Sequence, residues 1–223
     1  MKKIFNAYQL VGHLSTFFDR MMTNADLPAR LALKFFWGLN EAAYQKFLVQ
    51  AFAGVPKNFS GRLLEVPVGT GVLSLPVYKN LNGAEIFCLD YSDKMLDAAQ
   101  ARAEQMNLRG IKFIQGDVGN LPFEGNFFDL ALSVNGFHVF PDKNAAWSET
   151  YRVLRRGGIF CGCMYVKGEN SRTDFFVEKF CDWQGFFCPP HETLSSLKEK
   201  LSQKYSSVEV SHVESFAGFI CTK

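Results

Sequence analysis

Five short apolar runs alternate with helical patterns after Pro56, and this alternation constrains the fold of the 223-residue chain more than any other feature. The runs are RLLEV (62–66), AEIFCLD (84–90), IKFIQGD (111–117), FDLALSV (128–134) and GIFCGCMYV (158–166). The stretches between them indicate helices, because they carry apolar residues at three- and four-residue spacings. They are VLSLPVYKNL (72–81), DKMLDAAQARAEQM (93–106) and KNAAWSETYRVLRR (143–156). Continuous apolar strands separated by helices are typical of a parallel sheet that is covered on both faces.

The two ends of the chain differ from this central pattern. Residues 1–55 contain helical patterns rich in Phe, Leu, Ala and Met, and we expect them to form an N-terminal helical cap. Residues 56–223 are expected to form the ligand-binding domain, which an aromatic-rich insertion at 167–189 interrupts. That insertion could serve as a lid over an apolar substrate or as a dimer interface. The final patterns, SVEVSHVE and SFAGFICTK, are close enough to pair as an antiparallel hairpin.

Composition restricts the class of protein. The chain is 48% hydrophobic, which suits one globular domain, and its formal net charge of +2 gives no argument for a nucleic-acid partner. No apolar stretch is long enough to span a membrane, and no signal-peptide cleavage pattern follows the N-terminus. The six cysteines contain no CxxC pair, so a zinc site lacks support and a reducing compartment fits. We expect a cytoplasmic protein without metal, membrane or nucleic-acid partners, and its oligomeric state stays open.

Acidic residues end the first three strand patterns. Glu65, Asp90 and Asp117 lie where the first, second and third runs end. Ligands of such sheets bind at the carboxyl ends of the strands, so the three acids should surround one crevice. Asp90 lies about 20 residues beyond a glycine-rich turn, where an acid can accept hydrogen bonds from ribose hydroxyls. Asp117, one strand further out, is placed to recognise an adenine amino group.

The glycine-rich turn itself, in LLEVPVGTG, favours a cationic ligand over a pyrophosphate. A carboxylate at Glu65 would repel a pyrophosphate, and Pro67 removes one of the backbone N–H donors that a pyrophosphate uses. S-adenosylmethionine has a ribose, an adenine, a sulfonium cation and a free amino group, and it has no phosphate. These residues therefore predict S-adenosyl-L-methionine as the cofactor.

Residues 61–166 resemble the S-adenosylmethionine-dependent methyltransferase superfamily, in particular the small-molecule methyltransferases that include the ubiquinone and menaquinone biosynthesis enzymes. The matching segments are LLEVPVGTG, IFCLDYSDKML, FIQGDVGNLPFEGNFFDLALSVNGFHVFPD and ETYRVLRRGGIF, which occur in family order and spacing. The resemblance implies an α/β, Rossmann-like, doubly wound fold. Its sheet would have seven mostly parallel strands with an antiparallel last strand. The implied activity is methyl transfer to a small-molecule acceptor.

The resemblance also implies which residues contact the cofactor. Pro67 departs from the family, because a glycine usually stands at this position, and Arg156 replaces a common proline. The implied contacts are Glu65, Pro67, Gly69 and Gly71 for the methionine part, Asp90 for the ribose, Tyr91, Met95, Asp117 and Val118 for the adenine, and Asn135 after the fourth strand.

His138, in the same segment as Asn135, is the candidate catalytic residue and could act as a general base for the acceptor. It could equally be a polar residue of the pocket wall, because methyl transfer can proceed by positioning alone. Two rival functions stay open. Gly69-x-Gly71-x-x-Ser74 nearly satisfies the fingerprint of an NAD(P)-dependent oxidoreductase. The domain could also bind S-adenosylmethionine without catalysing a reaction.

Overall fold

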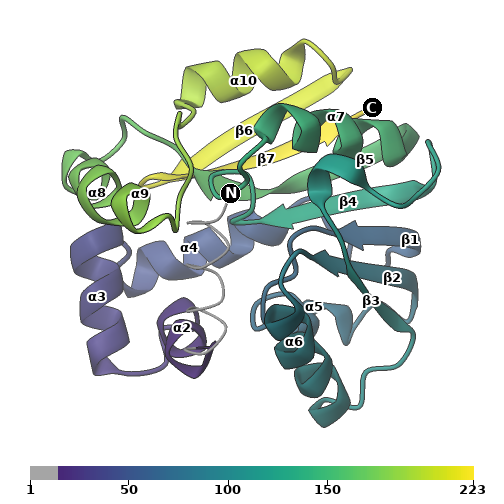
Figure 1. Cartoon of the computed structure of the whole chain (residues 1–223), viewed down its shortest axis with the longest axis horizontal. Helices are drawn as coiled ribbons and strands as arrows, with labels where there is room; N and C mark the ends of the chain where they lie inside the picture. Colours follow the sequence, from purple (N-terminus) through teal and green to yellow (C-terminus); the bar gives the residue numbers. More distant parts are fainter. Residues whose placement is uncertain (1–14) are drawn as a thin grey trace.

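A seven-stranded sheet forms the centre of the computed structural model, which describes the backbone of residues 15–223 and the side chains from Asp19 onward (Figure 1). The strand order is β3-β2-β1-β4-β5-β7-β6. β7 runs antiparallel to both β5 and β6, and the other strand pairs of the sheet are parallel. The strands are β1 (Ser60–Glu65), β2 (Gly83–Asp90), β3 (Ile111–Gln115), β4 (Phe128–Val134), β5 (Leu154–Tyr165), β6 (Ser207–Val213) and β7 (Phe216–Thr222). The predicted fold class, including the antiparallel last strand and its hairpin with β6, is confirmed.

Helices cover both faces of this sheet, as the apolar strands predicted. The helices are α2 (Ser15–Met22), α3 (Leu27–Trp37), α4 (Glu41–Phe52), α5 (Leu75–Tyr78), α6 (Asp93–Gln105), α7 (Lys143–Val153), α8 (Ser171–Phe176), α9 (Asp182–Gln184) and α10 (Leu194–Ser202). A 3-10 turn, η1 (Val118–Asn120), follows β3, and a π-helical turn, η2 (Val177–Cys181), joins α8 to α9. Figure 1 shows α7 and α10 on one side of the sheet and α4, α5 and α6 on the other.

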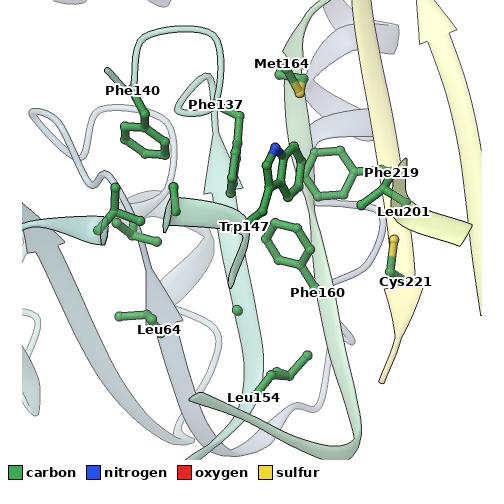
Figure 2. Close-up of a cluster of buried hydrophobic side chains, with 14 of the residues drawn as sticks. Leu64, Phe137, Phe140, Trp147, Leu154, Phe160, Met164, Leu201, Phe219 and Cys221 are labelled. Carbon is green, nitrogen blue, oxygen red and sulfur yellow. The ribbon is translucent and has the colours of Figure 1, made fainter. Parts of the chain in front are cut away.

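An aromatic core lies between the sheet and the α7–α10 layer (Figure 2). Trp147 of α7 stacks on Phe137 with ring centroids 3.7 Å apart, and it meets Phe160 of β5 edge-on at 5.9 Å. Phe137 belongs to the loop that follows β4, and its side chain is fully buried. This packing fixes the backbone of the loop, which also carries Asn135 and His138.

The helix α4 packs on the sheet rather than standing apart from it. The Gln50 side chain donates to the carbonyl of Phe216 in β7 at 2.9 Å and accepts from Ser211 Oγ of β6 at 3.0 Å. By contrast, α2 and α3 extend toward the carboxyl ends of the strands (Figure 1). The predicted boundary between a cap at 1–55 and a domain at 56–223, with the insertion at 167–189, stays a prediction.

Two helices are shorter than the sequence patterns suggested. The expected helix over 72–81 is reduced to α5, with Pro76 in its first turn, where the missing N–H costs no hydrogen bond. The expected helix over 143–156 ends at Val153, because Leu154 adopts an extended conformation and pairs with Phe128. The fifth strand therefore begins earlier than the predicted residue 158.

Candidate functional site

The carboxyl ends of four adjacent strands carry the predicted site residues. Because β3, β2, β1 and β4 are consecutive parallel strands of the sheet, their carboxyl ends lie side by side. Glu65 ends β1 and Asp90 ends β2, while Asp117 and Asn135 follow β3 and β4. The chain reverses its direction of winding between β1 and β4, and such a switch point is where open α/β sheets bind ligands.

The glycine-rich turn after β1 depends on left-handed backbone conformations. Gly69 has φ = 55° and Gly71 has φ = 68°, values that side-chain-bearing residues rarely adopt. A Cβ atom on Gly71 would lie 2.6 Å from Leu75 Cδ1, whereas one on Gly69 would meet no atom within 4 Å. The turn therefore has open space beside Gly69. Its start is packed against the loop after β4, since a Cβ atom on Gly136 would lie 2.4 Å from Pro67 Cδ.

Asp90 joins this turn to the end of β2. Its Oδ2 accepts from the backbone N–H of Gly69 at 2.8 Å, and its Oδ1 accepts from the N–H of Ser92 at 2.9 Å. Burial of the carboxyl group raises its pKa to about 6, although the hydrogen bonds from Ser92 and Gly69 oppose that rise. The backbone of Tyr91 also lowers the pKa of Asp90. An ionised carboxylate offers about four acceptor positions, so these backbone donors still leave capacity for a ribose hydroxyl.

Glu65 is buried more deeply than the sequence suggested. Its side chain is 1% exposed, and its Oε2 accepts from the Tyr78 hydroxyl at 2.8 Å. Desolvation raises the pKa of Glu65 to about 8, and the nearby charge of Asp90 adds to that rise. The group is thus poised to lose its proton when a cation comes near, because an opposite charge within a few ångströms favours the ionised form.

The residues assigned to the adenine surround the ends of β2 and β3. Tyr91 is 60% exposed next to Asp90, while Met95 is buried in the first turn of α6. Asp117 Oδ1 accepts from the N–H of Gly119 at 2.8 Å, and Val118 is buried in η1. An exposed aromatic ring and a partly engaged carboxylate at neighbouring strand ends fit the planar, hydrogen-bonding shape of an adenine.

The loop after β4 holds Asn135 and His138 in constrained positions. Asn135 has φ = 56°, an uncommon backbone conformation of the kind that often occurs at functional sites. His138 is buried, and its Nδ1 accepts from the backbone N–H of Tyr165 at 3.0 Å. The proton of the neutral ring therefore resides on Nε2. Burial, together with the charges of His191 and Lys143, lowers the pKa of His138 well below its ordinary value.

Aromatic rings from the N-terminal helices and from the insertion meet beside His138. The Phe187 ring lies 4.1 Å from the His138 ring and 5.8 Å from the ring of Trp37 at the end of α3. Trp37 also contacts Phe176 of α8 and Phe216 of β7, at 5.6 Å and 5.5 Å between centroids. The insertion thus packs directly on α3, and the two segments together form an apolar wall at this end of the sheet.

Asp19 of α2 is a residue that sequence reasoning missed. Its Oδ1 accepts from the Thr70 hydroxyl at 2.5 Å, and its carboxylate forms an ion pair with Arg102 of α6. Arg102 also donates to the carbonyl of Thr70 at 3.1 Å. Thr70 of the glycine-rich turn therefore contacts two helices that are distant in the sequence. Asp19 of α2 lies 51 residues before it, and Arg102 of α6 lies 32 residues after it. An isolated Asp on an amphipathic helix carries no signal for such a contact.

Asp182 and His191 form a second pair that the sequence did not single out. His191 Nε2 lies 2.9 Å from Asp182 Oδ1, and the imidazole side chain is 3% exposed. Its Nδ1 is buried without a hydrogen-bond partner among the residues that the structure describes. The ring also lies edge-on to Tyr165 at 5.1 Å. This hydrogen bond joins the start of α9 to the segment just before α10, so it holds together the two ends of the loop between these helices.

The glycine turn, the acids and the sheet together form a nucleotide-binding type of site. Residues 64–162 match the family described as a methyltransferase domain, and the predicted resemblance to the S-adenosylmethionine-dependent methyltransferase superfamily is confirmed over these residues. The residues at the strand ends fit S-adenosylmethionine: Asp90 has free acceptor capacity, Glu65 can ionise beside a cation, and Gly69 borders open space.

Several curated proteins are similar over this region. The chain is 37% identical over 97 residues to the demethylmenaquinone methyltransferase of Thermus thermophilus, covering 44% of each chain. It is 32% identical over 145 residues to the ubiquinone/menaquinone biosynthesis C-methyltransferase of Rickettsia prowazekii, covering 62% of this chain and 56% of the relative. The chain therefore spans only about half the length of these relatives.

A solved structure resembles nearly the whole chain. An S-adenosylmethionine-dependent methyltransferase from Thermotoga maritima, described as a possible histamine N-methyltransferase, superposes with a TM-score of 0.69 at 18% identity. The match covers 97% of this chain and 99% of that one. At 18% identity the likeness shows the fold alone and says nothing about the substrate.

Proposed function

We propose that the protein transfers a methyl group from S-adenosylmethionine to a small-molecule acceptor. The observation that carries the proposal is the contact between Asp90 and Gly69. A buried carboxylate with free acceptor positions stands beside a glycine turn that borders open space. The match of residues 64–162 to the methyltransferase domain family supports this assignment.

Each proposed role is assigned from the position of the residue at the carboxyl ends of β1, β2, β3 and β4. S-adenosylmethionine supplies an electrophilic methyl group and a good sulfide leaving group. Asp90 would hold the ribose, and Tyr91, Met95, Asp117 and Val118 would hold the adenine. Glu65, Pro67, Gly69 and Gly71 would bind the methionine part, and Asn135 would face the methyl group. Fixing the two reactants in line supplies much of the rate enhancement without a catalytic base.

The acceptor would lie against the aromatic wall of Trp37, Phe176 and Phe187. Curated relatives are named for demethylmenaquinone and for 2-methyl-6-phytyl-1,4-hydroquinone, which supports an acceptor with an aromatic or quinone-type ring.

His138 stays a candidate catalytic residue. Because its Nδ1 accepts from Tyr165 N–H, the neutral ring would offer an Nε2–H donor to an acceptor oxygen. A cytoplasmic location is proposed on the six unpaired cysteines.

Calorimetry with S-adenosylhomocysteine and with NAD distinguishes this function from its first rival. We expect S-adenosylhomocysteine to bind and NAD not to bind. Binding of NAD alone would establish the oxidoreductase and overturn the proposal. Transfer of a labelled methyl group to a panel of hydroquinones and amines then separates an enzyme from a non-catalytic binding domain, because the latter would bind the cofactor without turnover.

A further inference from the structure

Six exposed apolar side chains gather on α3 and on the segment from α8 to α9, and we call this surface the α3–α9 face. On α3, Leu27, Leu31 and Phe35 are 67%, 58% and 58% exposed and follow one another at four-residue spacing, so they share one side of the helix. On the second segment, Phe175, Phe180 and Trp183 are 64%, 44% and 65% exposed. A folded protein seldom exposes so many large apolar side chains in one place without a function.

Direct contacts make the two segments one continuous surface. The Arg172 guanidinium of α8 lies 5.3 Å above the Phe35 ring and donates to the carbonyl of Lys34 at 3.3 Å. The Thr173 hydroxyl donates to the carbonyl of Phe36 at 2.8 Å. Figure 1 shows α3 next to α8 and α9 at one end of the molecule, away from β3 and α6.

Four cations lie on the α3–α9 face. Arg30 and Lys34 lie between the exposed apolar residues of α3, which contains no acid, and Arg172 and Lys179 are exposed on α8 and η2. None of these four cations forms an ion pair within residues 15–223.

The acids of the α8–α9 segment have their own partners. Asp174 accepts from the Tyr165 hydroxyl at 2.7 Å, Glu178 pairs with Lys167 at 2.5 Å, and Asp182 pairs with His191 at 2.9 Å. Only Glu178 is balanced by a cation, because the Tyr165 hydroxyl is neutral and burial lowers the pKa of His191. The four cations outnumber the two remaining carboxylates, Asp174 and Asp182, so the face carries a net positive charge.

We propose that the α3–α9 face docks on the surface of a lipid bilayer that contains anionic headgroups. Exposed Leu, Phe and Trp side chains insert at the boundary between headgroups and acyl chains, and interleaved Lys and Arg attract anionic lipids. A two-fold contact between identical faces is less favourable, because it would bring the four cations of one copy against the four of the other.

This docking differs from membrane spanning. No helix among the described residues is long and apolar enough to cross a bilayer, and the expectation of no membrane partner rested on segment length alone. An interfacial face needs no spanning segment. The proposal goes beyond methyl transfer and involves none of the residues assigned to the cofactor, so vesicle binding and cofactor binding can succeed or fail separately.

Vesicle sedimentation of the full chain tests the proposal. We expect binding to phosphatidylcholine vesicles that contain about one third phosphatidylglycerol, weaker binding to pure phosphatidylcholine, and loss of binding in high salt. The double variant Lys34→Gln/Lys179→Gln should weaken binding roughly 30-fold, since each cation contributes about fivefold. Leu31→Ser and Phe175→Ser should each weaken it as well.

Matched controls lie outside the α3–α9 face. Val49 is 72% exposed on α4, and Lys46 is an exposed cation on the same helix. Val49→Ser and Lys46→Gln should bind vesicles like the wild type, and every variant should bind S-adenosylhomocysteine equally. The proposal is overturned if the wild type ignores anionic vesicles or if the controls lose as much as the test variants. It is also overturned if sedimentation equilibrium shows a dimer that Leu31→Ser dissociates, because the face would then join two copies of this chain.

Discussion

The carboxylate of Asp19 in α2 accepts a hydrogen bond from the hydroxyl of Thr70 in the glycine-rich turn, at 2.5 Å. Thr70 is 2% exposed, and the ion pair of Asp19 with Arg102 secures the arrangement from α6. The turn that is assigned to the methionine part of the cofactor is therefore held partly from the N-terminal helices. Order in α2 and order in the turn should depend on each other.

Asp19→Asn should weaken S-adenosylhomocysteine binding about tenfold, because Asn cannot sustain the ion pair that fixes the turn. Hydrogen bonds to charged groups contribute about 1.5–3 kcal/mol, and part of that is screened because the side chains of Arg102 and Asp19 are 29% and 16% exposed. Calorimetry measures the affinity, and hydrogen exchange should report faster exchange near Thr70. Asp26→Asn is the matched control, since it loses the exposed Arg20 pair yet keeps an N-cap side chain for α3. Equal affinities for the two variants would show that Asp19 has no special role.

Asp90→Asn should weaken cofactor binding by roughly ten- to a hundredfold, because a neutral amide replaces the charged acceptor of the ribose hydroxyls. Asn is preferred to Ala, since Asp90 also accepts from Gly69 and Ser92, and Ala would leave both backbone donors unpaired. A cofactor analogue without ribose hydroxyls should lose the same factor on the wild type and much less on the variant. Affinity within about twofold of wild type would contradict the proposed cofactor placement.

Glu65→Gln should alter the pH dependence of stability. Burial raises the pKa of the folded-state carboxyl to about 8 from an ordinary value of 4.5. Between these two values the unfolded chain has released the proton while the folded protein retains it, so wild-type stability should fall as the pH rises through this range. Gln cannot ionise and should remove most of that slope in thermal unfolding.

The same carboxyl should report cofactor binding through protons. If the cofactor ammonium comes near Glu65, binding at about pH 7 should release a proton, which calorimetry in buffers of different ionisation enthalpy detects. The Glu65→Gln variant should release less. Proton release that is unchanged in the variant would place the ammonium elsewhere.

His138→Asn separates a catalytic role from a structural one. An Asn oxygen can replace Nδ1 as the acceptor for Tyr165 N–H, but it leaves nothing at the position of Nε2. If Nε2 contacts the acceptor, kcat should fall by about 10²–10⁴ while the melting temperature changes little. Full activity of the variant would establish His138 as part of the pocket wall. Because its pKa is lowered well below 6.5, the wild-type rate should show no His138 titration above that pH.

Gly162→Ala should destabilise the sheet severely. Gly162 has φ = 148°, and a Cβ atom there would lie 1.9 Å from the carbonyl oxygen of Ser133 in β4. We expect a loss of at least about 3 kcal/mol and a fall in melting temperature of roughly 6–12 °C. Gly110→Ala is the control, since that glycine has φ = 80° but open space around it. A Gly162→Ala protein as stable as this control would contradict the packing described.

The sequence predicted the sheet well because its strands are buried on both faces. The apolar run 128–134 is too short and too uniformly apolar for a surface helix, and the observed bounds of β4 match it. Once the strands were predicted, the acids at their carboxyl ends could be read directly from the sequence. The contacts of Asp19 and the Asp182–His191 pair could not be predicted, because they join segments whose relative placement depends on tertiary packing. The burial of Glu65 could not be predicted either, because its partner is the Tyr78 hydroxyl. The sequence pattern of a short helix does not show in which direction the Tyr78 side chain points.

Gly38, between α3 and α4, has φ = 72° and separates helices with different attachments. The helix α4 is bonded to β6 and β7 through Gln50, whereas α3 carries Trp37 to the aromatic wall beside His138. A chimaera joined at Gly38 would keep the Gln50 bonds of α4 to the sheet, but it would replace Trp37 and Asp19 together. A change of the residues beside His138 by exchange of α2 and α3 would therefore also have to preserve the contact that holds the glycine-rich turn.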